Sequence, residues 1–304
     1  MGTHKTSLFL PIAGLLFAML LWGTSFVTMK LALQSYHPFL VVFGRMIIAS
    51  LVFLLFGKRL KQFSYQKGDW KYLLLLALCE PCLYFVFESY ALLYTTSSQA
   101  GIVSASLPLM VAFAAMMFLK ERLNPAVILG GGIAIAGIVL ISSQSVVTRD
   151  APNPLLGNIL ELIAMSCAAG YTLIARYLGT RYSAVALTAI QCFIGSVFFA
   201  PVLFLPSVHF PETFALVPSL SIVYLGSCVT VGAYSLYNYG LQKIPASQAS
   251  AFINLIPVFA VLCGWIVLGE RLTIFQGIGM GLVLAGVWLS SYRFGSPKFG
   301  VSSA

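Results

Sequence analysis

The sequence predicts an all-α integral membrane protein with ten transmembrane helices, arranged as two inverted repeats of five. Three observations support this expectation. Hydrophobic residues make up 60% of the 304 residues and charged residues only 8%. The apolar residues fall in long runs, and a set of short motifs recurs along the chain. A soluble domain carries about 25% charged residues to cover its surface, so a chain with so few must face lipid over most of its area.

A bilayer core requires roughly 20 apolar residues per helix, and on this measure the chain divides into ten spans. We expect them near residues 8–33, 39–57, 70–94, 98–119, 125–143, 156–178, 184–205, 218–241, 247–268 and 274–292. The start of the first span resembles a signal peptide, since Lys5 precedes the apolar run. No small-residue cleavage site follows and the run continues to Leu33, so we expect a membrane helix there.

The formal net charge is +9, but no basic stripe with interleaved aromatic residues lies in a polar domain, so we expect no nucleic-acid partner. Short cytoplasmic loops retain Lys and Arg. With the N-terminus inside, the cytoplasmic segments hold Lys5, Lys58, Arg59, Lys61, Lys67, Lys71, Lys120, Arg122, Arg176, Arg181, Lys243, Arg293 and Lys298. The opposite side holds Lys30, Arg149 and Arg271. We therefore expect a multi-pass protein of the bacterial inner membrane with both termini in the cytoplasm.

An internal repeat divides the chain into halves, residues 1–147 and 148–304. Ser98-Gln99-Ala100 recurs as Ser247-Gln248-Ala249, an offset of 149. The same offset relates Pro108 to Pro257, Glu121-Arg122-Leu123 to Glu270-Arg271-Leu272, and Gly130, Gly132 and Gly137 to Gly279, Gly281 and Gly286. Earlier in each half the offset is 146, which relates Lys30 to Arg176 and Ser50 to Ser196. Shared apolar composition alone would not keep these residues in one register.

Each half contains five predicted spans, and an odd number forces the second half to enter the membrane upside down. Inverted repeats are a recurring basis for alternating access, because two such halves can exchange inward-open and outward-open shapes. The alternative is that duplication only built a stable bundle. With short loops and no soluble domain in the sequence, we expect a transporter.

Several motifs resemble the drug/metabolite transporter superfamily, EamA family. Trp22-Gly23-Thr24-Ser25-Phe26 is similar to the family's opening motif, and Leu268-Gly269-Glu270-Arg271-Leu272 to its xGERL element. The resemblance extends over about residues 12–293. It implies a 5+5 inverted repeat around a central cavity lined by helices one, three, four, six, eight and nine. It also implies export of amino acids, related metabolites or drugs. Arg45 resembles an arginine that is often found in the second helix of the family.

Two acidic residues lie within the third span, and charged groups in a membrane need a reason. Glu80, Tyr84 and Glu88 are spaced four residues apart, so we expect them along one helical face. Their counterparts are Val229, Ala233 and Tyr237, so the fold does not require this acidic face. Either carboxyl group is a candidate to bind a cationic group or exchange a proton. The alternative is that Glu80 or Glu88 pairs with Arg45 or Lys30, or lies near the interface.

Pro81 removes a backbone donor beside this acidic face, so we expect a kink. The other candidate substrate-binding residues are polar or aromatic side chains within the spans: Trp22, Ser104, Tyr171, Tyr234, Asn238 and Asn254. Tyr234 and Asn238 share a face. Alternatives remain open for each set, since tyrosines also form belts at the membrane surface and buried amides also join helices.

The sequence shows no catalytic triad, no cluster of metal ligands and no phosphate-binding loop, so we expect no enzyme, no metal and no cofactor. The Cys79-Glu80-Pro81-Cys82 motif lies within an apolar span, where packing explains it best. Active transport would then use an ion gradient, with Glu88 and Glu80 as the proton-coupling candidates. A lipid-handling or lipid-flipping protein is the alternative, and the partners expected are a small molecule and the bilayer, for a monomer or a dimer.

Overall fold

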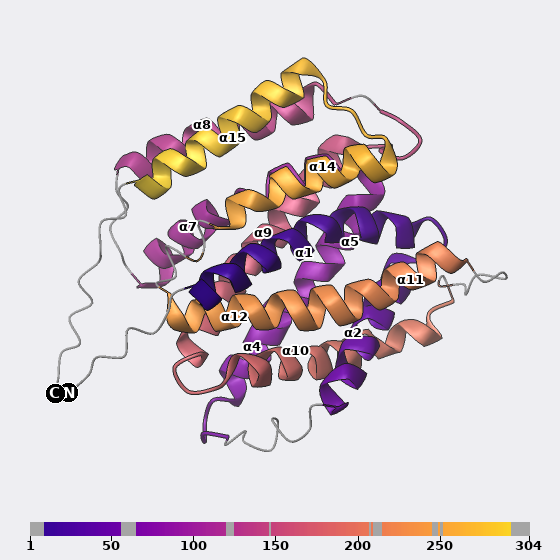
Figure 1. Ribbon diagram of the computed structural model, residues 1–304, viewed down its shortest axis with the longest axis vertical. Helices are drawn as coiled ribbons and strands as arrows, with labels where there is room; N and C mark the ends of the chain where they lie inside the picture. Colours follow the sequence, from indigo (N-terminus) through magenta and orange to yellow (C-terminus); the bar gives the residue numbers. More distant parts are fainter. Residues whose placement is uncertain are drawn as a thin grey trace.

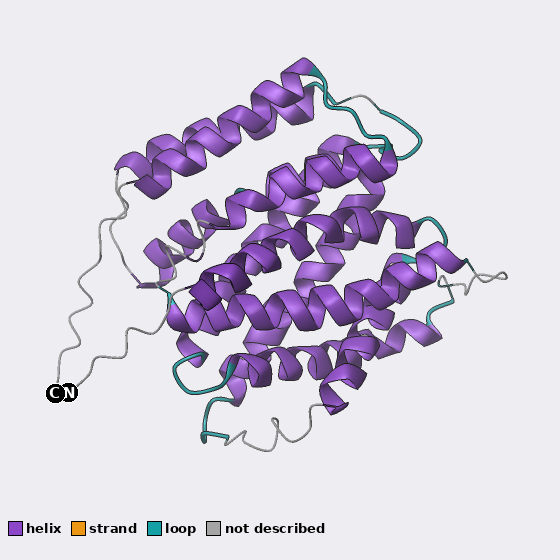
Figure 2. Cartoon of the chain, in the orientation of Figure 1, coloured by secondary structure: helices purple, strands orange, loops and turns teal. Residues whose placement is uncertain are grey.

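The computed structural model describes residues 9–55, 65–119, 125–145, 147–206, 208, 215–244, 249 and 252–292. Helices make up almost all of this part of the chain, as Figure 2 shows, and its one β-bridge joins Thr148 and Ala151. The helices of the first half are α1 (Phe9–Leu33), α2 (Pro38–Leu55), α4 (Trp70–Ala77), η1 (Leu78–Leu83), α5 (Tyr84–Tyr94), α6 (Ser97–Ser104), α7 (Leu107–Leu119) and α8 (Pro125–Ser143). Those of the second half are α9 (Pro154–Leu178), α10 (Ala184–Phe199), η2 (Ala200–Phe204), α11 (Leu216–Tyr224), η3 (Leu225–Ala233), α12 (Tyr234–Lys243), η4 (Phe252–Leu255), α14 (Ile256–Leu268) and α15 (Ile274–Tyr292).

Seven helical spans are long and apolar enough to cross a membrane. They are Phe9–Leu33, Pro38–Leu55, Trp70–Tyr94, Ser97–Phe118, Pro154–Leu178, Ala184–Phe204 and Leu216–Lys243. Three shorter apolar helices cover Ile128–Ser143, Phe252–Leu268 and Ile274–Leu289. The protein is therefore an all-helical membrane protein.

Local sequence signals set several helix starts. Asn153 accepts a hydrogen bond from the Leu156 amide and Pro154 follows it, so α9 begins with a capping side chain and a proline in its first turn. Thr96 caps α6 and Ser183 caps α10 in the same way. These side chains satisfy amides that a helix end leaves without partners, which a membrane protein must do near the bilayer.

Helices α8 and α15 form an antiparallel pair at the edge of the bundle (Figure 1). A Cβ added to Gly137 would lie 2.6 Å from the Gly279 carbonyl oxygen, and one added to Gly286 would collide with the Gly130 carbonyl. Close packing of glycines therefore joins the two helices at these positions. Gly132, Gly277 and Gly281 have nothing within 4 Å of an added Cβ, so they do not contribute to it.

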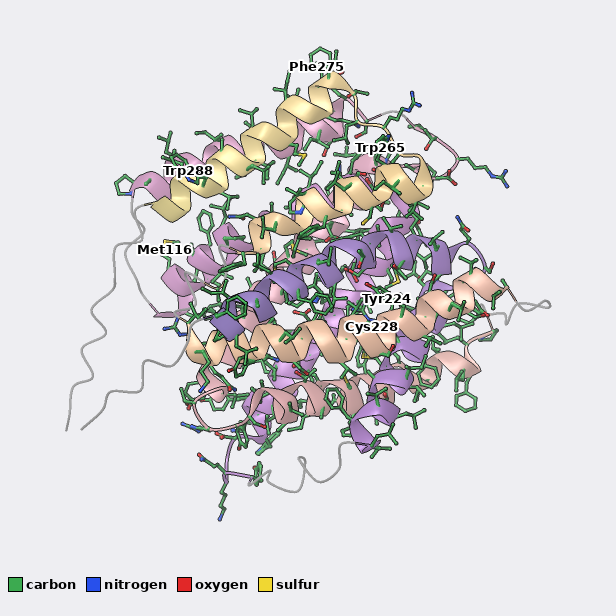
Figure 3. The ribbon with its side chains drawn as sticks, viewed as in Figure 1. Met116, Tyr224, Cys228, Trp265, Phe275 and Trp288 are labelled. Carbon is green, nitrogen blue, oxygen red and sulfur yellow. The ribbon has the colours of Figure 1, made fainter. Side chains whose placement is uncertain are left out.

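The outer surface carries large apolar side chains. Trp265, Phe275 and Trp288 project from α14 and α15 in Figure 3 and are 56%, 53% and 62% exposed. Exposure of so many large hydrophobic groups is costly in water and favourable in lipid. The membrane is therefore the natural environment of this surface.

Polar contacts join the helix ends at one end of the bundle. Asp69, before α4, accepts hydrogen bonds from Arg181 at 2.7 Å and from the Tyr182 hydroxyl at 3.0 Å. The hydrogen bond with Asp69 raises the pKa of the Arg181 guanidinium above its ordinary value. The turn between α9 and α10 is thereby attached to the start of α4.

Candidate functional site

A small cavity of about 40 Å³ lies inside the bundle. Its walls come from α1, α2, η1, α5, α6, α7, α9, α12, η4 and α14. These correspond to the predicted set of helices, with the addition of α2. The polar and aromatic side chains that line it are Trp22, Ser25, Phe26, Arg45, Glu80, Tyr84, Phe85, Glu88, Ser104, Tyr171, Thr172, Tyr234 and Tyr237.

The acidic wall is formed where the third span is interrupted. Glu80 has a non-helical backbone (φ −151°, ψ 118°) and its bond to Pro81 is cis. The kink expected at Pro81 is confirmed. The expectation that Glu80, Tyr84 and Glu88 follow one regular helical face is wrong at Glu80, because the proline breaks the α-helical geometry there. All three side chains nevertheless line the same cavity, and Tyr84 donates a 2.8 Å hydrogen bond to Glu88.

Arg45 lies against Glu88, with 3.9 Å between Nη1 and Oε2, and both side chains are buried. Its Nε donates to Thr230 at 2.6 Å, and the guanidinium lies 4.0 Å from the centre of the Phe85 ring. Of the alternatives left open for Glu88, the structure contains the pairing with Arg45. A buried pair at this distance repays little of its desolvation cost, so it is weak evidence for a stabilising role.

Lys30 does not pair with either cavity carboxylate. Its Nζ donates to the backbone carbonyls of Leu92 at 3.3 Å, of Asp150 at 2.6 Å, and of Thr95. Glu270 lies at the same end of the bundle and accepts hydrogen bonds from the amides and hydroxyls of Ser97 and Ser98, at the start of α6. We call this region, formed by Lys30, Thr95, Asp150, Glu270 and the start of α6, the Glu270 end.

Glu80 is bound from the second half of the chain. The Tyr234 hydroxyl donates to its carboxylate. Gln191 donates to its backbone carbonyl at 2.6 Å. The tyrosine is buried at 5% exposure, so a membrane-surface belt does not explain it.

An aromatic cluster faces the acidic wall. The Trp22 ring lies 5.2 Å from that of Tyr234 in an edge-on arrangement and 4.9 Å from that of Tyr237. The Trp22 Nε1 has no hydrogen-bond partner among the described residues. Edge-on packing favours aromatic pairs, and the free indole N–H leaves a donor at the cavity wall.

The remaining predicted residues divide between the cavity and its surroundings. Ser104 lines the cavity, with its hydroxyl donating to the Gly101 carbonyl at 2.7 Å. Tyr171 also lines it and donates to Asn238 at 2.9 Å. Asn238 lies behind Tyr171 and donates in turn to Thr188 at 3.0 Å, so it holds a lining residue rather than lining the cavity. Asn254 lies in η4 outside the lining set.

Sequence reasoning missed Glu161, which lies on α9 and is fully buried. It also did not list Arg45 among the site residues, although the resemblance pointed to that position. The criterion that selected Glu80 and Glu88, a charged residue inside an apolar span, applies equally to Glu161. Several predicted residues lie outside the described part of the chain: Glu121, Arg122, Ser247 and Gln248.

Cys79 and Cys82 are free thiols. Within the described residues, no group of three or more His, Cys, Asp or Glu side chains could hold a metal ion.

Comparisons with known proteins agree with the geometry. The model of the EamA-like transporter family matches residues 9–143 and again 155–292. The chain is 28% identical over 292 residues to an uncharacterized transporter of Archaeoglobus fulgidus, covering 95% of this chain and 98% of that protein. It is 31% identical over 294 residues to the uncharacterized transporter YcxC of Bacillus subtilis, covering 91% and 90%. A solved crystal structure with 19% identity superposes with a TM-score of 0.65 over 94% of this chain and 99% of that one, which supports the fold alone. The chain therefore belongs to the EamA-like transporter family.

Proposed function

We propose that this membrane transporter is a secondary exporter of small metabolites, such as amino acids or related compounds or drugs. It works by alternating access around the cavity, and ten spans form two inverted halves. The observation that carries the proposal is a buried cavity with one guanidinium and two carboxyl groups in a bundle of apolar helices. Charged groups inside a membrane are costly and mark substrate or ion pathways.

Contacts between the halves support the inverted repeat. Ser50 and Ser196, related by the offset of 146, lie with their hydroxyl oxygens 3.0 Å apart. Gly130 meets Gly286 while Gly137 meets Gly279, which is the reciprocal pattern of a two-fold axis. Two equivalent halves related in this way have two equivalent open shapes.

Interrupted helices at the cavity give further support. The π-helical segments η1 and η3 lie at positions related by the offset of 149, in the third and eighth predicted spans. Arg45 of α2 bonds Thr230 in η3, and its counterpart Gln191 of α10 bonds the Glu80 carbonyl in η1. Discontinuous helices at the level of the substrate are common in secondary transporters.

The cavity chemistry indicates the class of substrate. Carboxyl groups of Glu80 and Glu88 would bind an ammonium group, and the rings of Trp22 and Tyr234 would favour a cation by contact with their faces. Arg45 would bind a carboxylate. A zwitterionic or cationic compound with an apolar body fits this combination best, and proton exchange at Glu88 or Glu80 would couple its export to the proton gradient.

The test is transport in proteoliposomes, with a substrate found by thermal-shift screening of amino acids, nucleosides, polyamines and drugs. We expect Glu88→Gln and Glu80→Gln each to lower proton-driven transport by about tenfold or more and to flatten its pH dependence. Glu212→Gln is the matched control, because it removes a carboxylate between the spans predicted at 184–205 and 218–241. An unchanged pH dependence in both cavity variants would remove proton coupling through these residues, and a cavity that binds no compound would contradict the exporter.

A further inference from the structure

Glu161 is a buried carboxyl group for which the proposed site has no use. It lies seven residues after the start of α9, about 10 Å along the helix axis, and its side chain is 0% exposed. Neither carboxylate oxygen has a hydrogen-bond partner among the described residues. Desolvation strongly disfavours an isolated ionised carboxylate in such a place, so the group binds a proton or needs a partner that arrives during function.

The packing of α9 against α5 places Glu161 opposite Glu88. A Cβ added to Gly157 would lie 2.8 Å from the Ala91 carbonyl, and one added to Gly170 would lie 3.1 Å from the Cys79 sulfur. The two helices are therefore antiparallel, and the same register brings Glu161 to the level of Glu88. The two carboxyl groups are close enough to interact electrostatically.

The elements packed against α9 offer Glu161 no nearby cation. Helices α6, α7 and α8 carry no titratable side chain within their described residues. The titratable groups of the other elements that pack on α9 are Lys71, Tyr72, Cys79, Glu80 and Cys82 from α4 and η1, Tyr84, Glu88, Tyr90 and Tyr94 from α5, and Tyr234, Tyr237, Tyr239 and Lys243 from α12. Lys71 and Lys243 lie at the opposite end of the bundle from the start of α9. Arg45, on α2, is already paired with Glu88.

Polar side chains connect Glu161 with the Glu270 end. One turn before it, Asn158 donates to Gln99 at 3.2 Å and accepts from the Thr95 hydroxyl at 3.0 Å. The Thr95 carbonyl accepts from Lys30, which also binds the exposed loop at Asp150. This row of polar groups leads from the loop to within one helical turn of Glu161.

We infer that Glu161 is a proton-binding site that carries protons between the Glu270 end and Glu88 in the cavity. A proton adds to a carboxylate oxygen of Glu161 and later moves to a carboxylate oxygen of Glu88, with no other bond made or broken. If the carboxyl groups of Glu80, Glu88 and Glu161 were all ionised, the guanidinium of Arg45 would balance only one of their three negative charges. The substrate-free site therefore binds two protons. The role in transport rests on the proposed exporter, whereas proton binding at Glu161 does not.

Proton binding is tested on the purified full chain without any substrate. Infrared spectra are recorded from mildly acidic to mildly alkaline pH for the wild type, Glu161→Gln and the control Glu212→Gln, which lies between two predicted spans. We expect the carboxylic-acid carbonyl band to lose one component in Glu161→Gln and none in Glu212→Gln. Glu161→Asp, which keeps a carboxyl group, should retain the component at a shifted position even if the glutamine variant folds poorly. A spectrum unchanged in Glu161→Gln would overturn the inference.

The role in transport is tested by comparing two modes in proteoliposomes. Solute counterflow needs no net proton movement, so Glu161→Gln should keep it within about twofold while losing proton-driven accumulation by about tenfold or more. Loss of both modes in a folded variant would place Glu161 in substrate passage and overturn the proton route. If the wild type shows neither mode, the exporter proposal fails, and the infrared result still decides whether Glu161 binds a proton.

Discussion

Arg45 contacts three parts of the site with one planar group. It pairs with Glu88, donates to Thr230 and stacks on Phe85. Lysine has a compact charge without a planar fork, so it cannot make these contacts together. We expect Arg45→Lys to lower counterflow by about tenfold or more while the protein stays folded.

The effect of the Arg45–Glu88 pair on stability can be measured separately from its effect on transport. Arg45→Met leaves the Glu88 charge without its partner and should destabilise the protein by about 3–5 kcal/mol, measured by unfolding in detergent. Adding Glu88→Gln should recover most of this loss, because no uncompensated charge remains. Equal stability of the single and double variants would mean that the 3.9 Å pair has no energetic role.

At the level of single residues, the sequence selected seven of the eighteen residues that line the cavity, and it did not predict the contacts that position them. Trp22, Tyr171 and Tyr234 were selected as polar or aromatic groups inside apolar spans, and all three line the cavity. Asn238 met the same criterion but lies behind Tyr171. Helical spacing tells which residues share a face and not which neighbour that face meets, so only the fold could separate the two cases.

The helix pair α8 and α15 allows a matched test of glycine packing. A methyl group on Gly137 or Gly286 would collide with the backbone of the other helix, whereas one on Gly132 or Gly281 would meet nothing within 4 Å. We expect Gly137→Ala and Gly286→Ala to destabilise the protein by about 1–3 kcal/mol through forced separation of the helices. Thermal unfolding in detergent measures this.

The control variants should behave in the opposite way. Gly132→Ala and Gly281→Ala remove backbone freedom from the unfolded chain without a clash, so a stabilisation of about 0.5–1 kcal/mol is expected. Similar effects of all four substitutions would contradict a packing role of Gly137 and Gly286 that Gly132 and Gly281 do not share.

Among the elements, the helix limits followed from composition, while their interruptions did not. The spans expected at 70–94 and 125–143 agree with the observed Trp70–Tyr94 and Pro125–Ser143. Pro81 predicted the kink in the first half. No comparable signal marks η3, which contains no proline, so its π-helical geometry depends on the partners it meets in the folded bundle.

For the whole molecule, the cavity lies between two ends that are closed by different contacts. Near α4, Asp69 holds the turn between α9 and α10. At the Glu270 end, the Glu270 carboxylate of the second half binds the start of α6 in the first half. Gly269 before it has a left-handed conformation (φ 66°), which turns the chain at the end of α14. Alternating access requires that one such closure break while the other holds.

The Glu270 contact is where we expect opening toward the side opposite the termini. Each hydrogen bond to a charged group contributes about 1.5–3 kcal/mol, so Glu270→Ala should raise the population open at that end by about tenfold or more.

The measurement is the rate at which a membrane-impermeant thiol reagent, added outside cells, labels Ser104→Cys in the cavity, in a background without reactive native cysteines. Glu270→Gln keeps one acceptor oxygen and should give an intermediate rate, while Glu212→Gln, between two predicted spans, should leave the rate unchanged. If Ser104→Cys is labelled no faster with Glu270→Ala than without it, the Glu270 carboxylate does not close this end. If labelling accelerates only from the cytoplasmic side, the orientation predicted from the Lys and Arg distribution is wrong.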